Sequence, residues 1–319
     1  KVNKKKILFT NKITNFRDCS IIFISSDVPT NTKGESDLSF IKKNIKDIER
    51  KFSNKNLIIM SQVYPGFTEG LKWKKNKLFY QVETLVFGQA FIRAFKPERI
   101  ILGVHNLNKK INRKILNYYK KFNCPVLKTN FRTSELIKIS INLYLISSIT
   151  TTNIISSICK KIGAKWNDIE NSLRMDRRIG KYAYLKPGLG ISGGNLERDL
   201  TNIINISKKY EIDKNLFNIW KTNSLYQKDW TSRIFNKYIK AAKPNSIGIL
   251  GLSYKENTDS TKNSPSINFI KKYKKIKFCA YDPSIKQLKI KNVNLASSYS
   301  EVLKKSRIIF IMTPWKEFK

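Results

Sequence analysis

Two pairs of polar residues repeat one four-residue spacing in segments whose pattern is helical. Lys138 and Asn142 lie in an apolar stretch, and Asn195 and Asp199 follow a run of glycines. Residues four apart share one helix face, so each pair can act on a single ligand. Fixed cations and amide donors of this kind stabilise developing oxyanion charge. Taken alone, Lys138 also fits a lysine that snorkels to the helix edge, and Asn195 fits an N-cap with Asp199 as a solvent-facing carboxylate.

The glycines before Asn195 formally satisfy a dinucleotide-loop pattern, GxGxxG, over residues 188–193. That loop requires a strand entering the turn and a helix N-terminus that receives the pyrophosphate. The preceding residues, Tyr184 to Pro187, form a poor strand that ends in proline. We therefore interpret the glycines as flexible backbone that approaches another ligand closely, not as the dinucleotide loop.

The elements that must position these residues follow from the apolar periodicity. In the first third, buried strands are predicted at 21–24, 57–60 and 99–103, with a helix at 38–52. This βαβ order predicts a doubly wound, parallel α/β sheet.

The second half of the chain predicts a long helix and a second sheet. A helix runs from a Ser134 cap to about Lys160, and its apolar surface needs cover from a small helical domain or a second subunit. A second Rossmann-like unit begins near Pro244, with strands at 246–251 and 277–283.

The composition limits the partners and the sites. The formal charge of +39 arises from lysines spread over every segment, which favours a solvated surface, with a basic nucleic-acid-binding protein as the competing hypothesis. Four cysteines without CxxC spacing and a single histidine, His105, predict no metal site and no histidine triad. Reduced thiols fit a cytosolic protein. The polar residues within 137–158 favour a buried helix over a membrane span.

Short motifs follow one another in order along nearly the whole chain. In the first part they are residues 29–38 (TPT…G…DLS), 61–69 (STVPPGTTE), 83–88 (NPEFLREG, weakly) and 96–103 (PDRIVIG). Later come 135–142 (AELxKxxxN), 178–180 (RIG), 251–265 (GLAFKxxTDDxRxSP), 281–283 (YDP) and 313–315 (TPW). The letters in parentheses are those of the UDP-glucose/GDP-mannose dehydrogenase family, which the chain resembles, except YDP and TPW, which are this chain's own residues and follow in the expected order.

The resemblance implies two Rossmann-like domains joined by a central helical domain. Their expected bounds are 1–128 for the remainder of the NAD-binding domain, 129–225 for the central domain and 226–319 for the UDP-sugar-binding domain. It also implies a cytoplasmic homodimer joined through the central helices, with no nucleic-acid or membrane partner. The chain does not start with Met and stops soon after a strand-like segment, so we expect both ends to be cut and the true glycine fingerprint to lie upstream of Lys1.

By the same resemblance, the reaction is two successive hydride transfers to NAD from C6 of a UDP-sugar, with UDP-glucose as the default over UDP-N-acetylhexosamines and GDP-mannose. Lys138, Asn142 and Asp199 match residues that hold a water and stabilise oxyanion charge, and Glu83 matches the base of thioester hydrolysis. The expected cofactor-binding residues are Pro29, Thr30, Ser61, Thr68 and Lys262, the last in place of an arginine. The expected substrate-binding residues are Arg178, Tyr184, Leu185, Lys186, Gly188, Gly190, Gly193 and Lys255.

The chain departs from the family at one catalytic position. Family members read GFGGSC before a helix containing KD, and here Asn195 falls on the cysteine while Asp199 falls on the aspartate. A helix N-terminus favours a cysteine thiolate, the species that captures an aldehyde, and an amide forms no thiohemiacetal or thioester. Three hypotheses follow: an enzyme that stops at the aldehyde, one that oxidises the hydrated aldehyde, and a retired relative that only binds.

Overall fold

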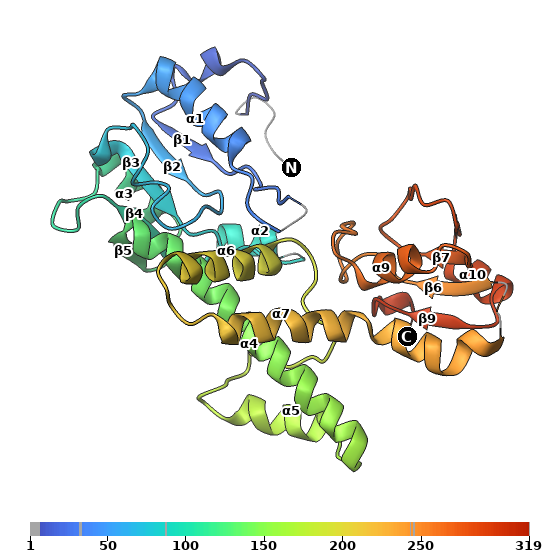
Figure 1. The fold of residues 1–319 in the computed structure, drawn as a ribbon. Helices are drawn as coiled ribbons and strands as arrows, with labels where there is room; N and C mark the ends of the chain where they lie inside the picture. Colours follow the sequence, from blue (N-terminus) through green and yellow to red (C-terminus); the bar gives the residue numbers. More distant parts are fainter. Residues whose placement is uncertain (1–6, 32–33, 87, 243, 245, 319) are drawn as a thin grey trace. The chain divides into compact units, whose positions relative to one another are not determined.

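The computed structural model describes residues 7–31, 34–86, 88–242, 244 and 246–318. The chain divides into two compact units, unit 1 up to Ser140 and unit 2 from Ile141. Figure 1 labels their helices and strands. The helix α4 (Phe131–Ile162) contributes to both units.

Unit 1 is built on a five-stranded sheet in sequence order. Its strands are β1 (Ile21–Ile24), β2 (Asn56–Ile59), β3 (Leu78–Gln81), β4 (Ile100–Val104) and β5 (Val126–Asn130). The first three strands are parallel, β4 is antiparallel to β3, and β5 is parallel to β4. The predicted α/β class is confirmed, but the sheet is mixed. Between β3 and β4 lies only the six-residue helix α2 (Ala90–Phe95), which buries no side chain and therefore does not serve as the covering crossover of a parallel return.

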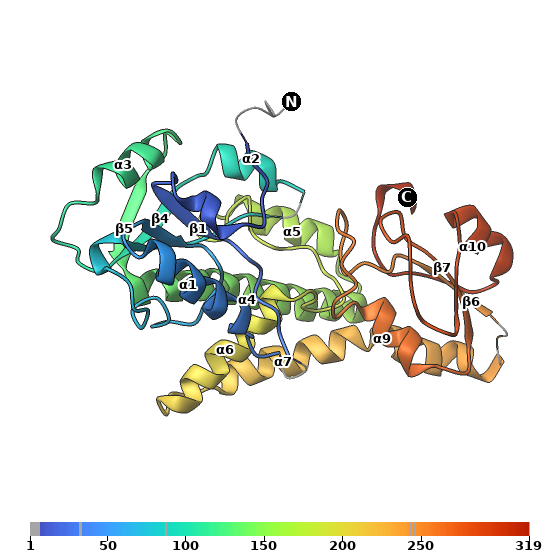
Figure 2. The ribbon, with the colours of Figure 1, turned by 90° about the horizontal axis from the view of Figure 1, so that it is seen from above.

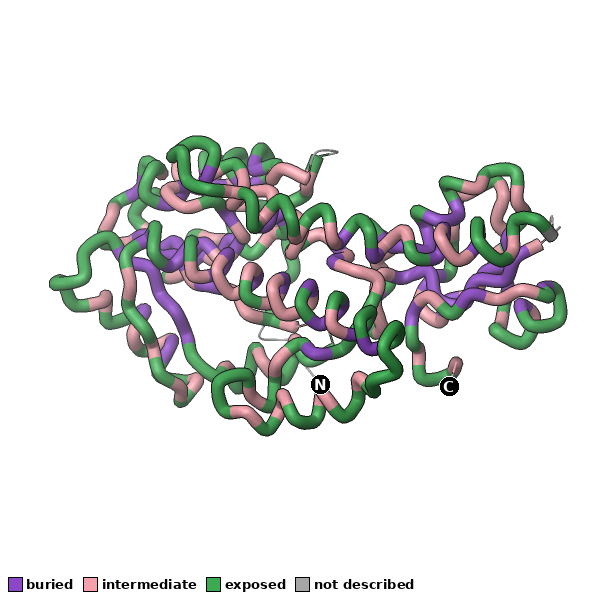
Figure 3. The backbone as a smooth tube through the Cα atoms, turned by 60° about the horizontal axis from the view of Figure 1, so that its bottom comes forward, coloured by how far each residue is buried: buried purple, intermediate pink, exposed green. Residues whose placement is uncertain are grey.

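Both faces of this sheet are covered. The helix α1 (Ser39–Phe52), close to the predicted 38–52, buries Ile41, Ile45 and Ile48 against one face. On the other face α3 (Arg113–Lys120) buries Ile115 and Tyr119. All four residues of β2 are buried, as expected of a central strand, and Figure 3 marks the buried backbone in purple.

The start of α4 differs from the prediction. The helix begins at Phe131, three residues before the expected Ser134 cap. Asn130, the last residue of β5, takes the capping role because its Oδ1 accepts a 2.7 Å hydrogen bond from the backbone N–H of Thr133. Ser134 is fully buried inside the helix, where its hydroxyl donates to the carbonyl of Phe131 over 2.9 Å.

Unit 2 contains a group of helices and a second sheet. After α4 come α5 (Trp166–Met175), α6 (Asn195–Lys209), α7 (Asn215–Lys228) and α8 (Trp230–Ile234). Figures 1 and 2 show α6 and α7 side by side. The sheet order is β8-β7-β6-β9, all parallel, as predicted for a Rossmann-like unit. Its elements are β6 (Ser246–Leu250), α9 (Pro265–Lys272), β7 (Lys277–Tyr281), β8 (Val293–Leu295), α10 (Tyr299–Lys305) and β9 (Ile309–Ile311).

Short helical turns complete the structure: η2 (Ile13–Phe16), η3 (Lys75–Lys77), η4 (Phe235–Ile239), η5 (Lys240–Ala242) and η6 (Lys316–Phe318). Among the described residues, no helix has the length and apolar character that crossing a membrane requires.

Candidate active site

In unit 1, the lysine of the apolar helix is buried beside a carboxylate. Lys138 is 9% exposed on α4, and its Nζ lies 3.8 Å from Oε2 of Glu83, in the segment after β3. The side chain therefore does not snorkel into solvent. A buried ammonium next to a carboxylate keeps its charge in a fixed place, as a group that stabilises an oxyanion must.

The residues expected to bind the cofactor lie in the loops that follow β1 and β2. Ser61 is 3% exposed and its hydroxyl donates to the carbonyl of Ser26 over 2.7 Å, while Thr68 is fully buried. These two shape the loops from inside. Pro29 is exposed and Thr30 half-buried, and the backbone bridge from Thr30 to Ser36 closes the first loop.

A residue outside the predicted site holds the second of these loops. Glu135, on α4, is fully buried, and its two carboxylate oxygens accept hydrogen bonds from the N–H groups of Gly66 (2.5 Å) and Thr68 (2.8 Å). Burial raises the pKa of this carboxyl group above its usual value, against the opposing effect of its hydrogen bonds. The sequence contains one hint, a glutamate in an apolar helix three residues before Lys138.

In unit 2, α4 and α6 bring together the two polar residues expected there. Nδ2 of Asn142 donates to Oδ2 of Asp199 over 2.5 Å, with the two residues 6% and 0% exposed. Arg198, also buried, places its Nε 3.8 Å from Oδ1 of Asp199. Asp199 is therefore a buried carboxylate held by an amide and a guanidinium, not the solvent-facing residue of the alternative interpretation.

Asn195 does not cap α6, contrary to the prediction. The helix begins at Asn195 itself and Gly194 occupies the N-cap position. The Asn195 side chain is exposed, and its Oδ1 accepts a 3.1 Å hydrogen bond from Nη2 of Arg198. The guanidinium of the same turn thus binds the oxygen that capping would require.

The residues before the glycine loop are anchored to α4 and α5. The carbonyl of Tyr184 accepts from the hydroxyls of Ser148 (2.9 Å) and Thr152 (3.3 Å). The carbonyl of Leu185, a buried residue, accepts from Nε1 of Trp166 over 3.1 Å. Lys186 is exposed, and the N–H of Gly188 donates to Oδ1 of Asn153 over 2.7 Å.

Gly190 and Gly193 approach protein atoms, whereas a Cβ at Gly188 would meet nothing within 4 Å, and the expectation that these glycines approach a ligand stays a prediction. Gly190 and Gly193 have φ of +80° and +85°. A Cβ at Gly190 would lie 2.6 Å from the carbonyl oxygen of Ser224, and one at Gly193 would lie 2.8 Å from the ring of Tyr254. Residues 184–188 form no strand, in agreement with our rejection of a dinucleotide loop.

Two predicted lysines lie beside this loop. Lys255 is half-buried with its Nζ 5.6 Å from the centre of the Tyr254 ring, and burial lowers its pKa. A Cβ on Gly194 would lie 3.4 Å from Nζ of Lys262, so this ammonium lies at the start of α6. The neighbouring Asn263 donates from Nδ2 to the carbonyl of Gly193 over 3.0 Å.

The side chain of Arg178 pairs with Asp176 and not with a residue of the glycine loop. Its guanidinium forms a bidentate pair with Asp176, over 3.0 and 2.6 Å, in the turn after α5, and its side chain is 89% exposed. A further residue missed from the sequence is Asp282, whose buried Oδ2 accepts from the N–H groups of Leu252 and Ser253. It fixes the turn that leads to Lys255.

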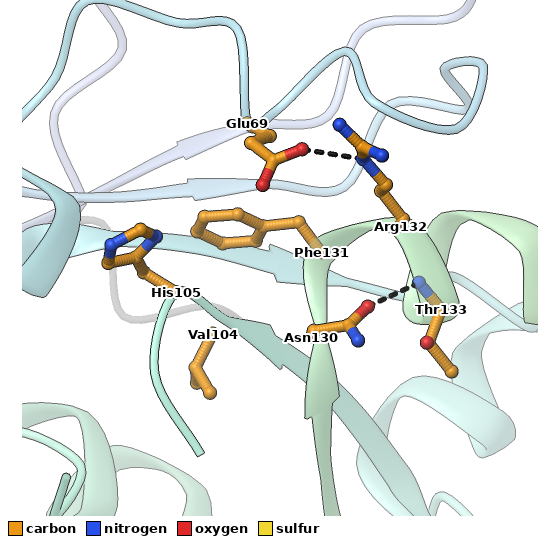
Figure 4. Close-up of a pocket in the computed structure, with 7 residues that line it drawn as sticks. All are labelled: Glu69, Val104, His105, Asn130, Phe131, Arg132 and Thr133. Atoms are coloured by element: carbon orange, nitrogen blue, oxygen red, sulfur yellow. Dashed lines mark hydrogen bonds and ion pairs between the residues drawn. The ribbon is translucent and has the colours of Figure 1, made fainter. Parts of the chain in front are cut away.

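Unit 1 also contains two cavities that no predicted site residue lines. One, of about 310 Å³, includes Glu69 and Arg132, which form a 2.6 Å ion pair (Figure 4). The other, of about 680 Å³, includes His105 and the segment 109–112. Within the part of the chain that the structure describes, no three His, Cys, Asp or Glu side chains are grouped to hold a metal ion.

Comparison with known proteins gives one consistent result. Three models of the UDP-glucose/GDP-mannose dehydrogenase family match: its NAD binding domain at 1–123, its central domain at 132–224 and its UDP binding domain at 248–319. The UDP-glucose 6-dehydrogenase of Rickettsia prowazekii is 32% identical over 335 residues, covering 98% of this chain and 76% of the relative.

Solved structures support the fold. A UDP-glucose dehydrogenase from Pyrobaculum islandicum has a TM-score of 0.87 at 20% identity, covering 99% of this chain and 77% of that one. A UDP-D-ManNAc dehydrogenase from Pyrococcus horikoshii has a TM-score of 0.81 at 22% identity, covering 97% and 74%.

Proposed function

The chain belongs to the UDP-glucose/GDP-mannose dehydrogenase family, and we propose that it oxidises the C6 alcohol of a UDP-glucose-type nucleotide sugar to the aldehyde with NAD. The observation that carries this proposal is the buried hydrogen bond between Asn142 and Asp199. A carboxylate with no exposed surface is costly to keep, and its two polar neighbours hold it in one geometry. Such a group suits the ordering of a water or a substrate hydroxyl.

In the proposed reaction, a C–H bond and an O–H bond of the sugar break, and residues of the chain stabilise the charge that develops. The hydride leaves C6 for NAD, which supplies the acceptor when bound, and the hydroxyl proton leaves to a base or to water. Negative charge develops on the C6 oxygen. Lys138 and Asn142, one turn apart on α4, supply a cation and an amide donor for that charge. Glu83 keeps the Lys138 ammonium in place.

The second oxidation in the family's scheme requires a nucleophile that this chain lacks at the matching position. Asn195 is exposed at the first residue of α6, and its amide forms no covalent adduct with an aldehyde. Without a thioester, Glu83 has no hydrolysis to assist. We infer that the aldehyde, or its hydrate, is the product and that one NADH forms per sugar.

The described residues fit one side of an NAD site. The loops carrying Pro29 and Ser61 follow the carboxyl ends of neighbouring parallel strands, the position at which open α/β sheets hold nucleotides. In unit 2, considered by itself, Lys262 beside Gly194 places a cation at a helix start, and the resemblance alone makes it a cofactor-binding residue; a lysine lacks the planar fork of the arginine that the family has there. For the nucleotide sugar, the segment 184–193 and Lys255 lie within one unit and supply backbone groups and a cation.

We further infer three functional domains, 1–128, 129–225 and 226–319, and a cytoplasmic homodimer joined through the central helices. Large apolar side chains on α4 and α5 favour the dimer: Ile162 is 71% and Met175 84% exposed. Sedimentation equilibrium would test it, and a monomer at micromolar concentration would contradict it.

Activity is tested by incubating full-length protein with NAD and, in turn, UDP-glucose, UDP-N-acetylglucosamine, UDP-N-acetylmannosamine and GDP-mannose, and following NADH absorbance. We expect NADH with at least one donor and a loss of about a hundredfold or more in kcat for Lys138→Ala, as for the removal of an oxyanion donor. The absence of NADH with every donor, from folded protein that still binds a UDP-sugar, would contradict the dehydrogenase proposal.

A further inference from the structure

Three charged residues of α4, spaced three apart, contact other segments of unit 1: two contact the loop 61–69 and one contacts the segment after β3. Arg132 pairs with Glu69 over 2.6 Å (Figure 4), Glu135 accepts from the N–H groups of residues 66 and 68, and Lys138 lies 3.8 Å from Glu83. Residues three apart lie on neighbouring positions of one helix face. Two turns of one helix therefore hold both the loop 61–69 and the proposed catalytic lysine.

The three contacts differ in burial, and the contact of Glu135 contributes most to holding the loop 61–69. The side chains of Arg132 and Glu69 are 72% and 43% exposed, and exposed pairs of this kind contribute little. Glu135 has no exposed surface. A buried, charged acceptor with two amide donors forms the stronger and less screened contact. The hold of α4 on the loop therefore rests chiefly on this one carboxylate.

The same part of α4 is packed tightly on the sheet. A Cβ on Gly103 of β4 would overlap the hydroxyl of Ser134, the residue before Glu135. The helix therefore lies so close to β4 at this point that only a glycine fits. A loop tied to Glu135 is thereby tied to a helix turn that has little freedom to shift.

We propose that Glu135 is a positioning residue that fixes the loop 61–69 to the helix turn carrying Lys138, so that cofactor in that loop and the catalytic lysine are held in one arrangement. This inference rests on the proposed function, in which the loop contacts NAD. The chemistry requires a carboxylate, because two N–H donors need two acceptor atoms. An amide or a protonated carboxyl group offers one acceptor and turns a donor toward the second N–H.

The first test is the isosteric variant Glu135→Gln, with Arg132→Gln as the matched control on the same helix. We expect the Kd for NAD to rise about tenfold or more in Glu135→Gln, the size expected when a hydrogen bond to a buried charge is lost. The KM for the nucleotide sugar should stay within about twofold, and so should every constant of Arg132→Gln, whose ion pair is exposed. An unchanged Kd for NAD in folded Glu135→Gln would overturn the proposal.

The second test needs only the wild-type chain and so does not depend on how the variant folds. Burial raises the pKa of Glu135, so its carboxylate takes up a proton at a higher pH than an ordinary glutamate. The affinity for NAD should therefore fall as the pH is lowered through that raised pKa, and the protection of the Gly66 and Thr68 amides, measured as exchange relative to the intrinsic rate at each pH, should fall in step. Protection of these two amides that stays constant across the fall in affinity would overturn the proposal.

The experiments distinguish a failure of the proposed function from a failure of the positioning role of Glu135. If wild-type protein binds no NAD and forms no NADH, the proposed function is wrong, and the role of Glu135 in cofactor binding is wrong with it. If wild-type protein binds NAD and turns over, while Glu135→Gln matches it in Kd, kcat and pH profile, only the positioning role is wrong.

Discussion

Nη2 of Arg198 donates a 3.1 Å hydrogen bond to Oδ1 of Asn195 within the first turn of α6. The amide oxygen at the position that we propose matches the family's cysteine thus already accepts a hydrogen bond from a cation of the same helix. That cation also lies 3.8 Å from the buried Asp199. A side chain at position 195 therefore meets a helix N-terminus and a guanidinium together, an environment that favours an anion.

This environment predicts that Asn195→Cys gains the second oxidation. A thiol at that position should have a lowered pKa, because both the helix N-terminus and Arg198 stabilise the thiolate. We expect NADH formed per UDP-glucose to rise from one toward two, with uronic acid among the products. Asn195→Ser, which places an unactivated hydroxyl at the same position, should stay at one. If Asn195→Cys also forms one NADH per UDP-glucose while its first oxidation proceeds at the full rate, the absence of a thiol does not limit the reaction and this prediction is wrong.

Removing the donor from the buried pair should cost both stability and activity. In Asn142→Ala the carboxylate of Asp199 stays buried without this amide, which should lower the free energy of unfolding by about 1.5–3 kcal/mol. We expect kcat to fall by about a hundredfold, since the proposed oxyanion donor is lost as well. Thr150→Val, at another buried polar position of α4, serves as the control and should leave kcat within about twofold. Equal kcat values for the two variants would contradict the role given to Asn142.

Gly193→Ala should be more damaging than an alanine at a glycine with similar backbone but open surroundings. Gly163 has φ +79° with no atom within 4 Å of an added Cβ, so Gly163→Ala reports the backbone strain alone, about 1 kcal/mol. At Gly193 the added Cβ also meets the Tyr254 ring at 2.8 Å. Thermal unfolding should show a further loss of about 1–3 kcal/mol from this overlap, together with a raised KM for the nucleotide sugar. Equal losses would mean that the loop adjusts freely.

The affinity for UDP should depend on the charge of Lys255. Burial lowers the pKa of this ammonium, so it loses its proton at a lower pH than an ordinary lysine. If the ammonium contacts the diphosphate, UDP affinity is full below that pKa and falls as the pH rises through it. Calorimetric titration with UDP across alkaline pH measures this. In Lys255→Arg the charge persists, so the fall should disappear. The same alkaline fall in both proteins would assign it to another group.

The sequence predicts the regular parts of the fold well, because apolar periodicity reports burial. The helix α1, the long helix α4 and the parallel second sheet lie close to their expected positions. The strands β3 and β5 were not predicted. The apolar run of β3, Leu78–Tyr80, is short and directly follows a lysine-rich segment. Every residue of β5 is exposed or half-buried at the sheet edge, so this strand shows no continuous apolar pattern.

Local capping and distant contacts account for the remaining differences. Asn130 rather than Ser134 caps α4, and Asn195 bonds to Arg198 rather than to the backbone, because neighbouring side chains compete for the same polar groups. Spacing within one helix indicated Lys138 and Asn142. Glu135 and Asp282 went unrecognised as positioning residues because their partners are 67 and 30 residues away in sequence.

The central claim, that oxidation stops at the aldehyde, is tested most directly by the yield of NADH from a limiting amount of nucleotide sugar. Full-length protein is incubated with excess NAD and no trap while NADH is counted. A carbonyl-trapping hydroxylamine is added only after the reaction is stopped, and the products are identified by mass spectrometry. We predict one NADH per sugar and the trapped C6 aldehyde. Two NADH per sugar with free uronic acid, formed by the wild-type chain, would contradict the claim.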